Sequence, residues 1–172
     1  ALISAHVDSG EPLPKSQLEA LLAAKNFQSG MQTLRQIEFA LFDLLIHAAS
    51  PAPDYQGILS TLDQVRDDVA VTPTPDYNRF ANGFSHIFAG GYAAGYYSYK
   101  WAELLSADAF SRFEEEGVFN AATGQAFRDN ILAGGGSLPA KTNFENFRGR
   151  EASIDALLRH GGFVEDKDGE VA

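Results

Sequence analysis

The segment from about Phe27 to Ala49 places the strongest constraint on the fold, because its apolar residues recur at helical spacing. This stripe consists of Met31, Leu34, Ile37, Leu41, Leu44 and Leu45. The second half of the segment is apolar nearly all round, which is typical of a helix buried inside a larger body. The prolines at 51 and 53 end the helix, since proline lacks the amide hydrogen that a helix interior needs. We therefore expect a central helix that other elements cover.

Helical periodicity continues along the rest of the chain, and no segment has the pattern of a convincing strand. A capping box, Ser16-Gln17-Leu18-Glu19, predicts a helix that starts at Ser16. Further helices are expected over about 54–69, 76–84, 92–116, 120–132 and 153–159, and residues 1–10 are expected to end another. The predicted fold is all-α, a multi-helix array that forms a single domain over 1–172, with a charged tail over 165–172 that frays.

Each predicted helix carries apolar side chains that we expect to face inward. They are Leu18, Leu21 and Leu22; Ile58, Leu62, Val65 and Val69; Trp101, Leu104, Leu105, Phe110 and Phe113; and Phe127 and Ile131. Phe144 and Phe147 are expected to anchor a short segment on the body. Gly117 is placed as a C-cap and Asn120 as an N-cap. Asp63, Arg66, Asp67 and Asp68 are expected to form a solvated helix face.

Composition narrows the classes of partner. The 172 residues carry a formal net charge of −10, which disfavours binding to nucleic acid or to an anionic membrane. The chain has no cysteine, so disulfides and thiol chemistry are excluded. No apolar run reaches the ~18 residues of a membrane span, and the first residues carry no signal-peptide pattern. The chain opens at Ala1 within an apolar segment, as a cut end does, although processing or tag removal would give the same start.

The most unusual stretch runs from His86 to Trp101 and combines tyrosines with glycines. Tyr92, Tyr96 and Tyr99 stand at i, i+4 and i+7, which places three phenols on one face of a helix. Gly90 and Gly91 precede them and give the backbone freedom to turn. A neutral phenol donates a hydrogen bond, so such a row suits a site where an oxygen develops negative charge. Taken alone, an aromatic pattern of this kind more often marks a stripe of core tyrosines whose hydroxyls reach local partners.

The segment from Phe84 to Trp101 resembles the C-terminal part of the catalytic domain of the thimet oligopeptidase family of zinc metallopeptidases. Further matching residues lie along most of the chain. They are Gly10-Glu11-Pro12-Leu13-Pro14, Ala23-Ala24-Lys25-Asn26-Phe27, Leu34-Arg35-Gln36-Ile37-Glu38-Phe39, Phe42-Asp43, Phe110-Ser111-Arg112-Phe113-Glu114-Glu115-Glu116-Gly117 and Phe147-Arg148-Gly149-Arg150-Glu151. The resemblance implies a metalloendopeptidase that hydrolyses short peptides in the cytoplasm.

The resemblance also implies a role for each residue of the loop. In the family, a zinc-bound water attacks the peptide carbonyl, and residues of this loop contact the substrate and the oxyanion. By position, Tyr99 is the oxyanion donor and His86 a second catalytic residue. Tyr92 and Tyr96 bind substrate, and the glycines at 90 and 91 let the loop close over the peptide.

No HExxH motif occurs in the sequence, and the four histidines stand far apart at 6, 47, 86 and 160. The resemblance implies that the zinc ligands lie upstream of Ala1, so that this chain binds no metal and is inactive alone. Its partner is then the remainder of the catalytic domain. A second class stays open, a non-catalytic helical module that binds peptides or proteins. An in-frame HExxH upstream of Ala1 distinguishes the first class from the second.

Overall fold

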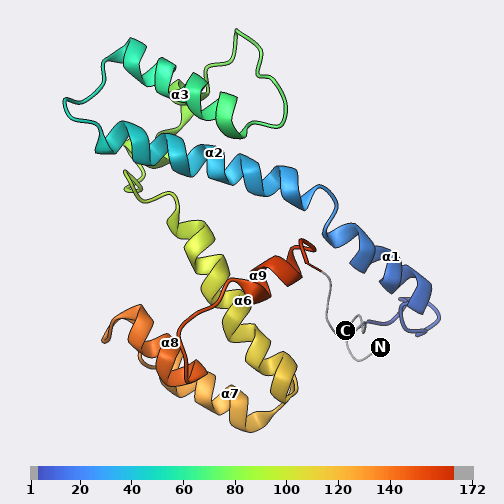
Figure 1. Cartoon of the computed structure of the whole chain (residues 1–172). Helices are drawn as coiled ribbons and strands as arrows, with labels where there is room; N and C mark the ends of the chain where they lie inside the picture. The colour runs from blue at the N-terminus through green and yellow to red at the C-terminus, as the bar shows by residue number, and fades with distance from the viewer. Residues whose placement is uncertain (1–3, 165–172) are drawn as a thin grey trace.

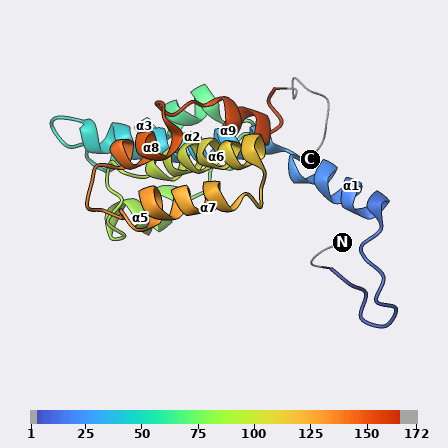
Figure 2. The ribbon, with the colours of Figure 1, turned by 90° about the horizontal axis from the view of Figure 1, so that it is seen from below.

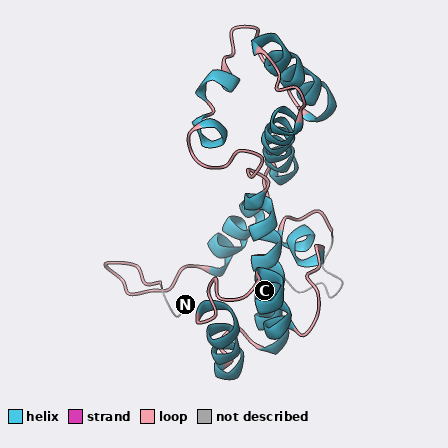
Figure 3. Cartoon of the chain, turned by 90° about the vertical axis from the view of Figure 1, so that its left-hand side faces the viewer, coloured by secondary structure: helices cyan, strands magenta, loops and turns pink. Residues whose placement is uncertain are grey.

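The computed structural model describes residues 4–164, which fold into helices and loops without a strand (Figure 3). The helices are α1 (Lys15–Lys25), α2 (Ser29–Ala48), α3 (Tyr55–Val69), α4 (Phe80–Gly83), α5 (Ser85–Phe88), α6 (Ser98–Glu116), α7 (Ala121–Phe127), the π-helix η1 (Arg128–Leu132), α8 (Ala140–Arg148) and α9 (Asp155–His160). The prediction of an all-α helical array is therefore confirmed. Over the same residues, no helix combines the length and apolar character that crossing a membrane requires.

The first apolar cluster joins α2 and α3 to the short helices α4 and α5. It is built around fully buried Phe42 and Ile87, and Leu62 of α3 is buried with them. As predicted, α3 turns Leu62 and Val65 inward, and Asp54 caps its start by accepting from the Gly57 amide at 2.8 Å. The helix expected over 76–84 is shorter and covers only Phe80–Gly83.

A second apolar cluster lies around α6, which forms a long rod with α7, α8 and α9 beside it (Figure 1). Phe144 and Phe147 of α8 are buried in this cluster, so their predicted role as anchors is confirmed. The predicted caps also hold: Asn120 accepts from the Ala122 amide at 2.9 Å, and Gly117 ends α6 with a φ of 104°. The assignment of a single domain over 1–172 stays a prediction, and its tail over 165–172 lies outside the described residues.

The predicted apolar stripe of α2 is only partly covered, with Ile37, Leu41 and Leu44 half-buried. Met31, Leu34 and Leu45 are exposed, and the buried residues of α2 are Glu38, Phe42, Asp43 and Ile46. The packing of α3 selects this other face, where Arg66 of α3 pairs with Glu38 at 3.1 Å. In the described chain α2 is therefore covered on one face and exposed on another, so the prediction of a covered central helix holds only in part, and the prediction that Arg66 is solvated is wrong.

Helix α1 leads away from the rest of the molecule and has no buried residue (Figures 1 and 2). It begins at Lys15 rather than Ser16, because the carbonyl of Pro14 accepts from the Gln17 and Leu18 amides, at 3.0 and 3.1 Å. The predicted capping box is therefore wrong. Leu18, Leu21 and Leu22, expected to point inward, are exposed, as are Trp101 and Phe110 of α6. Residues 4–10 contain a turn over 7–9 instead of the end of a helix.

Candidate functional site

The loop between α5 and α6 brings all the aromatic residues singled out from the sequence into one cluster. His86 lies at the end of α5, with its ring 5.9 Å from the ring of Tyr92 and 6.5 Å from that of Tyr99. The Tyr92 and Tyr99 rings stack at 5.2 Å, and Tyr96 lies 5.2 Å from Tyr99. We call these four residues the tyrosine cluster.

The cluster does not form in the way that the sequence pattern predicts. Helix α6 begins only at Ser98, so Tyr92 and Tyr96 lie in turns and not on one helical face with Tyr99. The helix cannot extend backward because Ala94 has a φ of 53°, in the left-handed region. The Gly95 amide donates to the carbonyl of Tyr92 at 2.8 Å and closes a tight turn. This turn, rather than helical spacing, brings the phenols together.

The loop conformation requires a glycine at each of the two positions before the cluster, for a different physical reason at each. A Cβ added at Gly90 would lie 2.7 Å from the backbone oxygen of His86, closer than atoms can approach without movement. Gly91 has a φ of +80°, which a residue with a side chain adopts only at a cost. Gly90 therefore allows the loop to pass close behind His86, and Gly91 allows it to turn toward Tyr92.

A buried carboxylate on α2 holds the turn. Asp43 has 0% exposure, and its two oxygens accept from the amides of Ala94 and Tyr96, each at 2.9 Å. His47, one helical turn later, lies with Nδ1 2.8 Å from Asp43 Oδ1. The sequence pattern did not assign a role to Asp43. The signal that could have found it is an ionisable pair at i and i+4 in the apolar half of a helix.

The hydroxyl groups of the cluster are in different environments. The Tyr96 hydroxyl donates to Gln36 Oε1 at 2.9 Å, and burial raises its pKa although nearby Arg35 opposes this. A hydrogen bond with the Tyr92 hydroxyl raises the pKa of Tyr99 above its ordinary value. The phenols of Tyr96 and Tyr99 are therefore neutral at pH 7, and the hydrogen of Tyr96 is already donated to Gln36.

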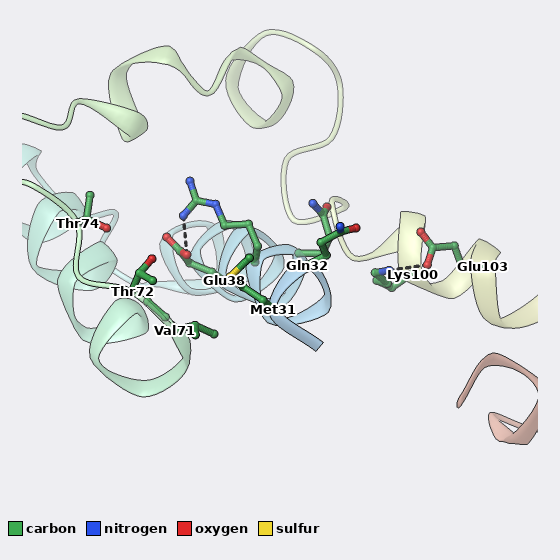
Figure 4. Close-up of a pocket in the computed structure, with 11 residues that line it drawn as sticks. Met31, Gln32, Glu38, Val71, Thr72, Thr74, Lys100 and Glu103 are labelled. Carbon is green, nitrogen blue, oxygen red and sulfur yellow. Dashed lines mark hydrogen bonds and ion pairs between the residues drawn. The ribbon is translucent and has the colours of Figure 1, made fainter. Parts of the chain in front are cut away.

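A hollow of about 540 Å³ lies beside the cluster, between α2, the residues after α3 and the first turns of α6 (Figure 4). Gln36 lines this hollow, and its Oε1 also accepts the hydrogen bond from the Tyr96 hydroxyl. The charged residues that line the hollow are paired with one another, since Arg35 binds Glu38 at 2.6 Å and Lys100 binds Glu103 at 2.5 Å.

The described residues do not fit a zinc site. Among residues 4–164, no three side chains of His, Asp or Glu gather as metal ligands would. Each histidine lies in a separate place: His47 beside Asp43, His86 among the tyrosines, His160 with Nε2 2.8 Å from Glu114, and His6 in the turn before α1.

Comparison with known proteins gives one family over nearly the whole chain. The family model for peptidase family M3 matches residues 1–163. Oligopeptidase A of Escherichia coli K12 is 57% identical over 162 residues, which are 94% of this chain and 24% of that protein. Oligopeptidase A of Haemophilus influenzae is 57% identical over 164 residues, 95% of this chain and 24% of that protein. Saccharolysin of Saccharomyces cerevisiae is 34% identical over 161 residues, 93% of this chain and 22% of that protein.

The chain thus spans about a quarter of the length of the curated relatives it matches. The resemblance stated from the sequence is confirmed, because the match covers the helices of both apolar clusters and the loop between them. The chain belongs to peptidase family M3.

Proposed function

We propose that this chain is the C-terminal part of the catalytic domain of a zinc-dependent oligopeptidase that hydrolyses short peptides. In this proposal, the tyrosine cluster binds the peptide and stabilises the oxyanion. The observation that carries the proposal is the gathering of Tyr92, Tyr96 and Tyr99 around His86, on a loop that a buried carboxylate holds. The names of the relatives, which are oligopeptidases, support the reaction class.

Tyr99 is the residue of the cluster best suited to donate to an oxyanion. Its side chain is 40% exposed, so a substrate can reach the hydroxyl, and its raised pKa keeps the hydrogen in place. When a peptide carbonyl is attacked, its oxygen gains charge, and a donor already in position stabilises that charge more than it stabilises the ground state. His86, exposed beside the rings of Tyr92 and Tyr99, is the second catalytic residue of the proposal.

Tyr96 and Tyr92 are assigned to substrate binding. The Tyr96 hydroxyl gives its hydrogen to Gln36, so its oxygen is left to accept from a peptide amide. Tyr92 presents a half-buried ring beside exposed Gly90 and Gly91, where the backbone is accessible to an extended peptide.

The remainder of the catalytic domain is the proposed partner of the exposed apolar faces. Half of the predicted stripe of α2 and the leucines of α1 are exposed here, although an apolar face of this kind is normally covered. The large exposed residues on these two helices and on α6 are Leu18, Leu21, Leu22, Met31, Leu34, Leu45, Trp101 and Phe110. In the proposal that remainder covers them and carries the zinc ligands, so the chain alone hydrolyses no peptide. A cytoplasmic location stays a prediction.

A chimaera tests the proposal: this chain replaces the segment that it matches in Escherichia coli oligopeptidase A. Steady-state kinetics on a fluorogenic peptide are measured for the chimaera, its Tyr99→Phe variant and a Tyr97→Phe control. Tyr97 is a neighbouring tyrosine of similar exposure, 47%, whose ring forms no ring pair with the cluster among the described residues.

We expect the chimaera to hydrolyse the peptide and Tyr99→Phe to lower kcat by ~10²–10³, the effect of losing one oxyanion donor. KM should change much less, and Tyr97→Phe should leave both parameters unchanged. An unchanged kcat for Tyr99→Phe with a lower melting temperature contradicts the proposal and makes Tyr99 a core residue. An inactive chimaera, together with peptide binding by the chain alone, favours the non-catalytic module.

A further inference from the structure

We propose that Asp43 is a positioning residue for the reaction, because its carboxylate holds the backbone turn that sets the geometry of the tyrosine cluster. The inference rests on the proposed function, since it concerns the same site. It assigns a catalytic consequence to a residue on α2 that does not belong to the cluster itself.

The contact of Asp43 with the loop is specific to one backbone conformation. Oδ1 accepts from the Ala94 amide and Oδ2 from the Tyr96 amide, both at 2.9 Å. Two amides separated by one residue reach the two oxygens of one carboxylate only if the chain turns between them. Ala94, with its φ of 53°, and the hydrogen bond from the Gly95 amide to the Tyr92 carbonyl provide that turn.

His47 fixes the orientation of the carboxylate. Its Nδ1 lies 2.8 Å from Asp43 Oδ1 and 2.9 Å from the Asp43 carbonyl oxygen. Both neighbours are acceptors, so Nδ1 carries a hydrogen and donates it. The Asp43 side chain has 0% exposure, so water cannot replace these partners when one is removed.

The held turn lies in the chain between the stacked rings of Tyr92 and Tyr99. Tyr92 precedes it, Tyr96 belongs to it, and the Tyr99 amide donates to the Tyr96 carbonyl at 3.3 Å. A displacement of the turn therefore moves Tyr92 relative to Tyr99 and alters their 5.2 Å stacking. A misplacement of about 1 Å at a reacting group lowers a rate by as much as about 100-fold.

Asp43→Asn is the informative variant. An asparagine of the same shape offers one oxygen, so one of the two loop amides would face an NH₂ group, donor against donor. Asp108→Asn is the matched control. Asp108 is also buried, at 1% exposure, and also accepts a backbone amide, that of Ser153 at 2.6 Å, but it lies in the second apolar cluster.

Both variants are made in the active chimaera, with Tyr99→Phe alongside. We expect Asp43→Asn to lower kcat by about 10- to 100-fold, with a much smaller change in KM, whereas Asp108→Asn lowers the melting temperature and leaves kcat within about twofold. Hydrogen exchange measured by mass spectrometry should accelerate over residues 92–99 in Asp43→Asn and not in the control. A kcat within twofold of the parent for Asp43→Asn, or unchanged exchange over 92–99, overturns the inference.

The failure of this inference is distinguishable from failure of the proposed function. If Tyr99→Phe lowers kcat and Asp43→Asn does not, the oxyanion role stands and the positioning role is wrong. If Asp43→Asn lowers kcat and Tyr99→Phe does not, the loop is positioned as proposed but Tyr99 is not the oxyanion donor. If Asp43→Asn does not fold, His47→Ala tests the inference instead. This variant removes a donor to the Asp43 carboxylate, and the His47 side chain is less buried than that of Asp43. A lower kcat with faster exchange over 92–99 then supports the inference, and no change in either overturns it.

Discussion

Replacing Asp108 by Ala should destabilise the junction of α6 with α8 and the segment after it. Asp108 is 1% exposed and accepts from Arg150, from the Ser153 amide at 2.6 Å and from Arg148 at 3.3 Å. Removing one partner of a buried ion pair costs about 3–5 kcal/mol. Arg150 is 42% exposed and regains water, and Arg148 keeps a bond of 2.6 Å to Glu115. These two compensations lower the expected loss in the free energy of unfolding to about 2–3 kcal/mol.

The same contacts predict a dependence on pH. Burial raises the pKa of Asp108, but hydrogen bonds from Arg150, the Ser153 amide and Arg148 outweigh it and lower the pKa below its ordinary value. A folded-state pKa that is depressed contributes stability above the unfolded pKa, and this contribution is lost as the pH falls through the folded value. The unmodified chain should therefore lose stability on acidification below about pH 4, and Asp108→Ala should lose less over that interval.

Urea unfolding of the 172-residue chain, followed by circular dichroism at several pH values, measures both effects. Asp63→Ala is the control, because Asp63 is exposed on α3, and it should change stability by less than about 0.5 kcal/mol. A loss below about 1 kcal/mol for Asp108→Ala at pH 7 would refute the reasoning, because the buried carboxylate would then contribute no more than a surface ion pair.

Two further predictions concern packing. Leu62→Ala should cost about 2–5 kcal/mol in a urea melt, because Leu62 is 3% exposed in the first cluster. Leu45→Ala, on the exposed stripe of α2, should cost less than about 1 kcal/mol, and equal costs for the two would contradict the assignment of faces. Gly90→Ala should cost about 1–3 kcal/mol and lower kcat in the chimaera, because its Cβ meets the His86 oxygen at 2.7 Å. Gly83→Ala, with nothing within 4 Å of its Cβ, should do neither, and a matching loss there would remove the steric explanation.

Helices whose partners lie nearby in the chain were predicted well from the sequence. The expected helix over 54–69 closely matches α3, and its residues Leu62 and Val65 are buried as predicted. Asn120 and Gly117 act as the caps that their residue types suggest. In both cases a short-range signal determines the structure, either periodicity against a neighbouring helix or a side chain that satisfies helix-end amides.

The buried face of α2 could not be predicted in the same way. Periodicity identifies an apolar stripe but not what covers it, and in the described chain Phe42 and Ile46 face the core together with the polar Glu38 and Asp43. Those acids are tolerated because Arg66 and the loop amides satisfy them, and these partners lie 28 and at least 51 residues away. No local pattern reports contacts at that separation. The exposed stripe is the part that, in the proposed function, the remainder of the catalytic domain covers.

The two buried aspartates, Asp43 and Asp108, both accept hydrogen bonds from backbone amides, but with different consequences. Each accepts backbone amides from a segment distant in sequence: Ser153 for Asp108, and Ala94 and Tyr96 for Asp43. Asp108 has two arginines as further partners, so its contribution is shared with the packing of the second cluster. Asp43 has His47 as its ionisable partner and otherwise depends on the two loop amides. Asp43 is therefore fully hydrogen-bonded only when the loop adopts this turn. The loss of its carboxylate should alter the positions of the tyrosines more than it lowers the stability of the fold.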